Sequence, residues 1–375
     1  MADAEREART ANEAKDQFIA MLSHELRTPL TPVLAAASAL VEFEGLPDQV
    51  RDTLAIVQRN VATEAQLIDD LLDLARLSHG KMRISKRPLD LHQAVHRAVE
   101  TLSAELRAKQ LQLGVDLTAT EHWVSGDDTR LQQVFWNLLR NAIKFTPEAG
   151  QIAIRTWNSG CRVFAEVSDS GQGIKSAMLA RLFEPFEQAL DQDGVSNRGL
   201  GLGLPICRGI LEQHEASIVA SSPGPGKGSR FVVEFANVEA VAAPAAQPPS
   251  VPPPAAANLK RILLVEDHPD TAAIFEMLLT RDGYDVTVAD SIQAALQVAR
   301  DTFDLVLSDV GLPDGTGLDL IRALRKSGSV KGIALSGYGT EEHVRASKEA
   351  GFDAHLTKPV NFDELRQAIA TLSRR

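Results

Sequence analysis

The sequence predicts a multidomain protein with three folded parts. These are an α-helical hairpin that pairs with a second copy into a dimeric four-helix bundle, an α/β domain with a largely antiparallel sheet, and an α/β domain with a parallel sheet. Apolar residues recur with helical spacing over residues 11–77, and helical and strand periods mix over residues 88–238. After residue 260, short apolar strands alternate with helical segments, which is the rhythm of a parallel sheet covered by helices.

Composition bounds the class of protein. The 375 residues carry a formal net charge of -11 and only two cysteines, Cys161 and Cys207. An acidic chain without a basic cluster is a poor partner for nucleic acid or an anionic membrane surface. No apolar run approaches the roughly 18 residues that a membrane span needs, and the two cysteines have neither metal nor redox spacing. We therefore expect a cytoplasmic protein with reduced thiols and no membrane span in this chain.

The helical hairpin is expected over residues 1–86. Gly45-Leu46-Pro47-Asp48 interrupts the helical period, with proline near a helix start. Two helices alone cannot bury an apolar stripe on each, so we expect a homodimer. Residues 1–16 are typical of the charged end of a signalling helix, so a sensor domain or sensor partner is expected upstream. The stripes are Phe18, Met21, Leu22, Leu26, Leu30 and Val33, and Leu54, Val57, Val61, Ile68, Leu71 and Ala75.

The first hairpin helix carries a candidate nucleophile, His24, in the segment SHELRTPL. Thr28 follows one turn later on the same face. Glu25 can take or hold an imidazole proton, and neutral imidazole is a nucleophile at physiological pH. Pro29 cannot donate to the carbonyl of Glu25, so it should bend the helix. For a His-Glu pair alone, an ordinary surface histidine is the alternative.

The first α/β domain is expected over residues 87–238, and a polar stripe marks its second helix. Asn137, Asn141 and Lys144 fall at i, i+4 and i+7. Asparagine is a poor helix former, so two asparagines on one stripe indicate a functional role. Amide oxygens can ligate Mg²⁺ and a lysine can meet phosphate, although a solvated polar face is an even alternative. Expected elements are helices Leu91–Leu106 and Asp128–Phe145, strands Gln151–Trp157, Cys161–Ser168, Ser217–Ser221 and Ser229–Phe235, and a turn at Asn158-Ser159-Gly160.

Two glycine-rich segments follow in the same domain. In the first, Asp169 comes directly after a strand and can accept from an exocyclic amine, while Gly171 and Gly173 permit close backbone approach. In the second, Gly199, Gly201 and Gly203 open a helix whose N-terminal amides form an anion site. A strand-end turn and a chance GxGxG are the alternatives. Between the two segments lie Phe183-Glu-Pro-Phe186 and the polar stretch Gln192–Arg198, which is typical of a mobile lid.

Residues 239–258 are Pro/Ala-rich and are expected to be a semi-extended linker before a last domain over residues 259–375. The last domain collects polar residues at its strand ends: Glu266, Asp267, Asp309, Ser336 and Lys358. The carboxyl ends of parallel strands share one edge of the sheet. The expected strands are Arg261–Val265, Asp285–Val288, Asp304–Ser308, Gly332–Leu335 and Ala354–Leu356.

Three carboxylates at one edge repel one another, so we expect Mg²⁺ at Glu266, Asp267 and Asp309. Asp309 is the candidate nucleophile, Ser336 a hydrogen-bond partner of a phosphoryl group, and Lys358 a charge partner. For any one of these residues, a solvated loop position is the alternative.

In combination, these motifs resemble the hybrid histidine kinase family. SHELRTPL resembles its phosphoacceptor box, the segments around Asn141, Asp169, Phe183 and Gly201 resemble the N, G1, F and G2 boxes of its ATP-binding domain, and the last domain resembles a response-regulator receiver. The resemblance implies an α/β sandwich for the ATP-binding domain, unlike a P-loop. It implies a flavodoxin-like receiver with a Lys358–Pro359 cis peptide.

The resemblance also implies roles for the site residues. His24 and Asp309 would accept phosphate, Asp169 would recognise adenine, and Asn137 and Asn141 would hold Mg²⁺. ATP phosphates would meet Lys144, Arg198 and the loop from Gly199 to Gly203. Two positions depart from the receiver pattern: His355 occupies a position that is often aromatic, and Gly311 offers no side chain to the site. The histidines at 79, 92, 96, 122, 214, 268 and 343 have no companions in sequence, so we expect structural or surface roles for them.

The function that follows is Mg·ATP-dependent autophosphorylation of His24. Transfer would then run to Asp309, to a histidine phosphotransfer protein or to a separate response regulator. Thr28 is placed to orient a water, which leaves phosphatase chemistry open. The rival class is a non-catalytic scaffold that binds nucleotide and docks a regulator; the intact His24, Asn141 and Asp169 disfavour it.

Overall fold

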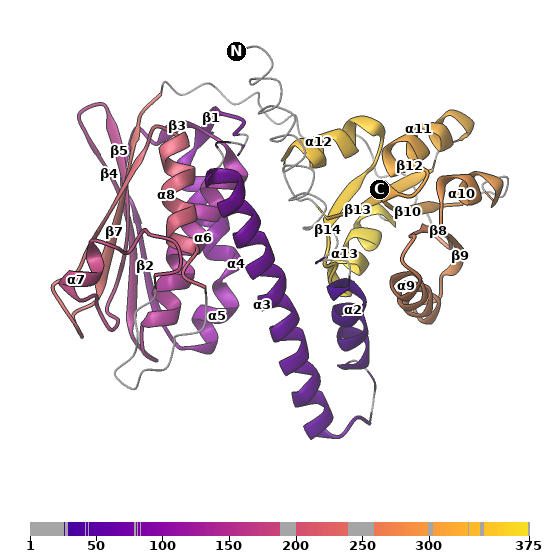
Figure 1. The fold of residues 1–375 in the computed structure, drawn as a ribbon, viewed down its shortest axis with the longest axis horizontal. Helices are drawn as coiled ribbons and strands as arrows, with labels where there is room; N and C mark the ends of the chain where they lie inside the picture. Colours follow the sequence, from indigo (N-terminus) through magenta and orange to yellow (C-terminus); the bar gives the residue numbers. More distant parts are fainter. Residues whose placement is uncertain are drawn as a thin grey trace, which may run out of the picture. The chain divides into compact units, whose positions relative to one another are not determined.

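The computed structural model describes residues 26, 29–41, 43, 45–78, 80, 82, 84–187, 200–238, 259–298, 303–328, 330–337 and 341–373. These fall into two compact units, one formed by Met1–Asp69 with Gln247–Arg375 and the other by Asp70–Ala246 (Figure 1). The predicted linker and most of the N-terminal helix lie outside the described residues. The domain boundaries drawn from the sequence stay predictions.

The first unit begins with two helices, α2 (Leu30–Val41) and α3 (Asp48–Ser78), the second of which continues into the other unit. The break predicted at Gly45 is confirmed, and its φ of 83° is a backbone conformation that glycine adopts freely. Within this unit α2 packs on α9 (Pro269–Arg281), where Ala35 and Ala39 are buried in the core. Arg281 donates to the carbonyl of Ala39 over 3.3 Å.

The rest of the first unit is a parallel sheet with helices on both faces, as predicted (Figure 1). The strand order β14-β13-β10-β8-β9 is the flavodoxin-like order, with the first strand in sequence second from one edge. The strands are β8 (Arg261–Val265), β9 (Asp285–Ala289), β10 (Leu305–Asp309), β13 (Lys331–Ser336) and β14 (Ala354–Thr357), with a short pair β11 (Gly311–Leu312) and β12 (Gly315–Thr316). The remaining helices are α10 (Ile292–Val298), α11 (Gly317–Ser327), α12 (Glu341–Ala350) and α13 (Phe362–Ser373).

The second unit is a two-layer α/β sandwich in which α4, α6 and α8 lie on one face of a five-stranded sheet (Figure 1). The strand order is β2-β4-β5-β7-β6, and every neighbouring pair except β2 with β4 is antiparallel. The strands are β2 (Gln112–Leu117), β4 (Gln151–Ser159), β5 (Arg162–Asp169), β6 (Ser217–Ser221) and β7 (Ser229–Ala236), with a separate pair β1 (Arg87–Asp90) and β3 (Trp123–Gly126). The helices are α4 (Leu91–Thr101), α5 (Ser103–Ala108), α6 (Asp128–Phe145), α7 (Ser176–Leu179) and α8 (Gly203–Gln213).

Side-chain caps fix where the two main helices of the sandwich begin. Asp90 accepts from the backbone N–H of His92 over 2.9 Å, and Asp127 accepts from that of Arg130 over 3.2 Å. Each cap satisfies a backbone donor that the first helical turn leaves free. The prediction of one helix over residues 91–106 is wrong in one respect, because buried Leu102 leaves the helical conformation and divides it into α4 and α5.

None of the helices in the part of the chain that the structure describes is long and apolar enough to cross a membrane.

Candidate functional site

A buried lysine lies between two carboxylates at the carboxyl edge of the parallel sheet. Lys358 Nζ is 2.9 and 2.8 Å from the two oxygens of Glu266 and 2.5 Å from Asp309 Oδ2. Asp309 ends β10 and Glu266 follows β8, so neighbouring parallel strands deliver both to one edge. The three side chains are almost fully buried, which makes each charge depend on the other two.

The same edge has a group of oxygen ligands suited to a hard dication. Glu266, Asp267 and Asp309 each place one carboxylate oxygen within 4.8 Å of the others, and Asp267 is exposed while the other two are buried. Burial and the neighbouring Asp309 raise the pKa of Glu266 to about 7, although Lys358 opposes the shift. Burial alone would lower the pKa of Lys358, but the carboxylates of Asp309 and Glu266 outweigh it and raise that pKa. The single positive charge of Lys358 does not balance the three carboxyl groups, so this edge of the sheet is suited to a bound Mg²⁺.

Backbone features hold Asp309 in place. Gly311 N–H donates to Asp309 Oδ1 over 3.0 Å, and Gly317 permits a close approach, since a Cβ there would lie 2.1 Å from the carbonyl oxygen of Asp309. Ser336 is buried at the end of the adjacent strand, one residue beyond the partner of Asp309. The Lys358–Pro359 peptide is cis, as the receiver resemblance implied. His355 contacts Ser347 Oγ of α12 over 3.0 Å, so this unusual residue has a partner in the fold.

In the second unit, α6 carries the predicted polar stripe. Asn137 is buried, Asn141 is half-buried and Lys144 is exposed, so the stripe runs from the core to the surface. Among the described residues, the side-chain nitrogen of Asn137 is buried without a hydrogen-bond partner of good geometry, which is costly for an amide. A Cβ on Gly203, the first residue of α8, would lie only 3.3 Å from Asn137 Oδ1. The glycine therefore keeps the oxygen of Asn137 open to the site.

Asp169 lies at the end of β5 with its carboxylate fixed from two sides. Gly171 N–H donates to Asp169 Oδ1 over 2.8 Å, and Ser229 donates its hydroxyl to Asp169 Oδ2. A carboxylate has about four acceptor positions, so acceptor capacity remains for an exocyclic amine. The half-buried Asp169 therefore has the chemistry that adenine recognition requires.

The glycines around Asp169 permit close backbone contacts. A Cβ on Gly171 would lie 2.4 Å from the carbonyl oxygen of Phe145, and one on Gly173 would lie 2.1 Å from that of Gly224. Gly201 has a φ of 70°, and a Cβ there would lie 2.4 Å from the carbonyl oxygen of Glu187. The α8 helix starts without a side-chain cap at Leu202, and the backbone N–H groups at a helix N-terminus can bind an anion.

Family comparisons match three parts of the chain in order. Residues 14–80 match the His Kinase A (phospho-acceptor) domain, residues 126–239 match the histidine kinase-, DNA gyrase B-, and HSP90-like ATPase, and residues 262–370 match the response regulator receiver domain. The chain belongs to the hybrid histidine kinase family. The α/β sandwich and the flavodoxin-like sheet are thus the ATPase and receiver domains of this family, and the recognition made from the motifs is confirmed.

Curated relatives of this hybrid histidine kinase span more than its own length. The sensory/regulatory protein RpfC of Xanthomonas campestris is 31% identical over 412 residues, covering 100% of this chain and 56% of RpfC. The circadian input-output histidine kinase CikA of Synechococcus elongatus is 32% identical over 365 residues, covering 94% of this chain and 47% of CikA. The chain therefore spans about half the length of these relatives. The crystal structure of full-length ShkA in complex with AMPPNP shares the fold, with a TM-score of 0.51 at 23% identity, covering 95% of this chain and 99% of ShkA.

Several histidine kinase residues singled out in the sequence lie outside the described residues. These are His24, Glu25, Thr28, Gly199 and the whole Gln192–Arg198 stretch, and their roles stay predictions. Among the described residues, the structure brings Glu266, Asp267, Asp309 and Lys358 together.

Sequence reasoning missed two residues that shape the ATPase site, Gly228 and Ser229. Ser229 holds the Asp169 carboxylate, and a Cβ on Gly228 would lie 1.9 Å from the carbonyl oxygen of Asp169. The run Gly226-Lys227-Gly228 directly before Ser229, the first residue of β7, indicates a turn, but it does not say which backbone Gly228 approaches.

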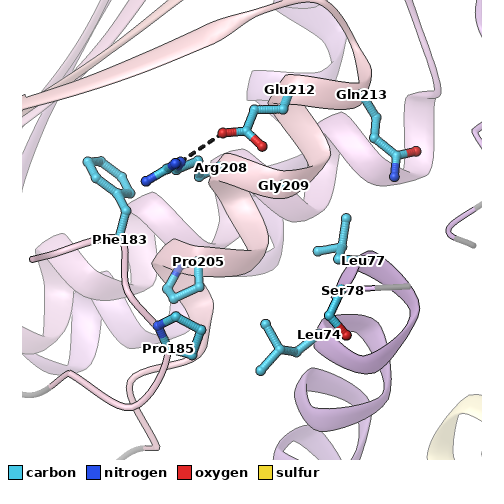
Figure 2. A pocket seen from close by; sticks show the side chains of 10 residues that line it. All are labelled: Leu74, Leu77, Ser78, Phe183, Pro185, Pro205, Arg208, Gly209, Glu212 and Gln213. Carbon is cyan, nitrogen blue, oxygen red and sulfur yellow. Dashed lines mark hydrogen bonds and ion pairs between the residues drawn. The ribbon is translucent and has the colours of Figure 1, made fainter. Parts of the chain in front are cut away.

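A cleft lies beside the ATPase site of the histidine kinase, between α8 and the end of α3. It has a volume of about 380 Å³. Figure 2 shows Leu74 and Leu77 of α3 facing Pro205, Gly209 and the segment with Pro185. Gly209 permits this approach, because a Cβ there would lie 2.8 Å from Leu77 Cδ1. The cleft therefore lies between the last turns of α3 and the helix α8.

Proposed function

We propose that this chain is an ATP-dependent protein-histidine kinase that phosphorylates its own His24 and passes the phosphoryl group to Asp309 of its own receiver. Transfer to a histidine phosphotransfer protein or a separate response regulator is the other route. Its input is proposed to come from a sensor domain or a sensor partner. The proposal places the catalytic steps in the cytoplasm, where ATP is available.

One observation carries this proposal: a single chain holds both an ATPase-type nucleotide site and a receiver-type acceptor site with their chemical groups assembled. Asp309 with Lys358 and Glu266 forms the acceptor site. Asn137 with an unpartnered amide and Asp169 with acceptor capacity form the nucleotide site. A scaffold that only binds nucleotide has no need of the buried Lys358–Asp309 pair, so the scaffold alternative is disfavoured.

The nucleotide site favours one orientation of ATP. Asp169 accepts from the adenine amine, and the N–H groups of Gly203 and Leu204 at the start of α8 donate to phosphate oxygens. The side-chain oxygens of Asn137 and Asn141 are suited to Mg²⁺, which supplies neutralisation of phosphate charge when bound. Lys144 at the exposed end of the same stripe adds a positive charge for the phosphates. The terminal phosphate is thereby directed away from the adenine.

Two phosphoryl transfers follow. An imidazole nitrogen of His24 attacks the terminal phosphorus, a P–N bond forms, and the P–O bond to ADP breaks; Glu25 takes the imidazole proton. Asp309 then attacks the same phosphorus, an acyl phosphate P–O bond forms, and the P–N bond breaks while Glu25 returns the proton to the leaving imidazole. Lys358 remains cationic beside Asp309, so it offsets negative charge on the phosphoryl group. Ser336 is proposed to donate a hydrogen bond to that group.

The receiver can reach the helical hairpin for the second transfer. About twenty linker residues span up to roughly 60 Å at about 3.1 Å per extended residue. Within the first unit, α2 of the hairpin also packs against receiver helix α9. Both facts support transfer within one molecule or one dimer.

The test uses the different stabilities of the two products. Phosphohistidine is a phosphoramidate and is acid-labile, whereas aspartyl phosphate is an acyl phosphate and is base-labile. With radiolabelled ATP, wild type should carry a mixture that turns over. Asp309→Asn should accumulate acid-labile label only, and His24→Ala should carry none.

The matched control is Asp290→Asn, an exposed receiver aspartate after β9, which should behave like wild type. If wild type and Asp309→Asn carry the same label with the same lability and decay, the internal relay must be abandoned. If wild type takes up no label from Mg·ATP, with or without a partner, the kinase assignment itself is wrong.

A further inference from the structure

Three side chains that can bind a metal converge where α4 begins, on the second unit. They are Asp90, His92 and His122, and one ligand atom of each lies within 4.8 Å of the other two. Asp90 Oδ1 is 3.5 Å from His122 Nε2, and the rings of His92 and His122 stack with centroids 4.1 Å apart. This pairing corrects the expectation that these histidines have no companions. All three residues are half-buried, so solvent reaches the cluster.

The cluster lies apart from the nucleotide site. His92 contacts Thr156 of β4, whereas Asp169 pairs with Ile152 at the beginning of the same strand. The phosphoryl chemistry proposed above uses none of the three residues.

The hydrogen bonds of His122 leave the lone pair of one ring nitrogen available. Its Nδ1 is 3.1 Å from the carbonyl oxygen of Ala119, and a carbonyl can only accept, so Nδ1 carries the hydrogen. In the neutral ring, Nε2 is then an acceptor that faces the carboxylate of Asp90. Two acceptors 3.5 Å apart repel each other unless a cation lies between them. A metal ion bound by both side chains would supply that cation.

His92 is held as a second imidazole ligand. Its Nε2 is 2.9 Å from Thr156 Oγ1, and that hydroxyl oxygen also accepts from the N–H of Ala119 over 3.3 Å. A metal-binding histidine usually donates its other ring N–H to an outer partner, which orients the ring; here His92 Nε2–H would donate to Thr156 Oγ1 and leave Nδ1 as the ligand atom.

The ligand spacing suits a tetrahedral ion. With metal–ligand distances of about 2.0–2.1 Å, two ligand atoms of tetrahedral Zn²⁺ lie about 3.4 Å apart. The contact between Asp90 and His122 is already at that distance. All three ligand atoms lie within 4.8 Å of one another, so a small adjustment of the side chains brings them to that spacing. Two imidazoles with one carboxylate suit Zn²⁺ and its neighbours in the first transition row rather than Mg²⁺ or Ca²⁺.

We propose that Asp90, His92 and His122 form a binding site for a transition-metal dication, with water as the remaining ligand. The ion joins the first turn of α4 to the segment that leads into β3. Because β1 and β3 pair at this point, the site would stiffen the entry to the ATPase domain, just after the chain leaves α3.

The test measures Zn²⁺ binding to the full chain by calorimetry with excess Mg²⁺ present. The excess Mg²⁺ is meant to fill the carboxylate site of the receiver, so that Zn²⁺ does not bind there. Wild type should bind one Zn²⁺, and His122→Gln should weaken that binding by roughly 10- to 100-fold or more. Asp90→Asn keeps an acceptor for the helix cap but loses the charge, so it should also bind Zn²⁺ more weakly while its helix content stays unchanged.

Co²⁺ gives a second readout, because its visible absorption reports tetrahedral ligation directly. The band should appear in wild type and be lost in His122→Gln and His92→Gln. Zn²⁺ should also raise the unfolding temperature of wild type more than that of either variant, since it binds the native state.

His96 provides the matched control, because it is exposed and lies one turn after His92 on α4. His96→Gln should bind Zn²⁺ like wild type. A loss in His96→Gln as large as that in His122→Gln would mean a simple helical His92–His96 chelate and would overturn the proposed site. Equal Zn²⁺ affinity of wild type and His122→Gln, or no Zn²⁺ binding to wild type, would overturn it as well.

Discussion

Asp169 shows how much of the nucleotide site depends on one carboxylate. Gly171 and Ser229 fix its orientation, which leaves the remaining lone pairs for an adenine amine. Asp169→Asn replaces one charged oxygen by a donor, so it should cost on the order of 1.5–3 kcal/mol of binding free energy. That corresponds to roughly 10- to 150-fold weaker ATP binding. Calorimetric titration with Mg·ATP measures it, and the exposed Asp116→Asn on β2 is the control. Binding like wild type would remove Asp169 from the adenine site.

Gly228 and Gly226 form a matched pair of glycines. Both have positive φ, 73° and 75°, but a Cβ on Gly228 would lie 1.9 Å from the carbonyl oxygen of Asp169 whereas a Cβ on Gly226 would meet nothing within 4 Å. Gly226→Ala should therefore cost only the backbone strain of about 1–2 kcal/mol. Gly228→Ala should cost more stability and should also weaken ATP binding, because the chain at Asp169 must move. Equal effects of the two substitutions on ATP affinity would contradict this account.

His214 links pH to the stability of the ATPase domain. Its Nε2 accepts from the N–H of Asp127 over 2.9 Å and its Nδ1 donates to the carbonyl of Ile210 over 2.7 Å, so the buried ring is held neutral. Burial lowers the pKa of His214 below its ordinary 6.5, although the Ile210 carbonyl and Asp127 oppose the shift and Lys86 adds to it. The unfolded state then binds more protons, so this contribution to stability is present above pH 6.5 and is lost as pH falls through the folded-state pKa.

The measurement follows from the three tryptophans, Trp123, Trp136 and Trp157, which all lie in this unit. Urea unfolding followed by tryptophan fluorescence should show wild type losing stability between pH 7.5 and pH 5.5. His214→Gln should be less stable at pH 7.5 but should show a flatter pH profile. Parallel profiles for the two proteins would show that His214 does not titrate with folding.

Local motifs could be predicted at the residue level, and contacts between distant segments could not. Asn137, Asn141 and Lys144 share one helix face, so their spacing alone predicts a common surface. The stacking of His92 on His122 joins α4 to a segment across the fold, and no sequence period encodes it. Gly228 is equally invisible, because its function is to leave room for the backbone of a residue in another strand.

Among the elements, the last turns of α3 and the start of α6 share a buried polar network. Asp73 Oδ2 accepts from Arg130 Nη1 and from Gln133 Nε2, each over 2.8 Å. Asp73→Ala leaves the Arg130 charge without its partner, so it should cost about 3 kcal/mol of the free energy of unfolding. Urea unfolding of the full chain by tryptophan fluorescence measures this, with the exposed Asp52→Ala on the same helix as control. A change below about 1 kcal/mol would place this pair among ordinary surface ion pairs.

The bounds of helices and strands were predicted correctly where the hydrophobic period is clear and a capping residue marks the end of the element. The predicted helix Asp128–Phe145 and strand Ser217–Ser221 have the observed bounds, and Asp127 caps the helix. Strand β2 was missed because it carries Gly114 and shows no burial alternation. The β1–β3 pair was missed because each strand has only four residues and its partner lies far along the chain.

Across the whole molecule, the hairpin still presents apolar residues that one chain leaves exposed. Leu26, Val33 and Leu40 recur every seven residues, which is the spacing of a helical seam, and all are between 44% and 45% exposed. On α3, Ile56 is 49% and Leu71 47% exposed. A second copy of the hairpin has the matching seam, so a four-helix bundle would bury both. The exposed seam supports the homodimer that the two sequence stripes predict.

The full chain should therefore be a dimer of twice 40.5 kDa in light scattering at micromolar concentration. Val33→Glu combined with Leu71→Glu places like charges in the seam of both copies and should give monomers that keep their ATP affinity, because neither residue lies in the nucleotide site. Val219→Glu is the matched control, since Val219 is 62% exposed on β6 of the ATPase domain and should leave the dimer intact. A wild-type chain that stays monomeric at tens of micromolar, or a seam variant that stays dimeric, would mean that the copies associate through another surface or not at all.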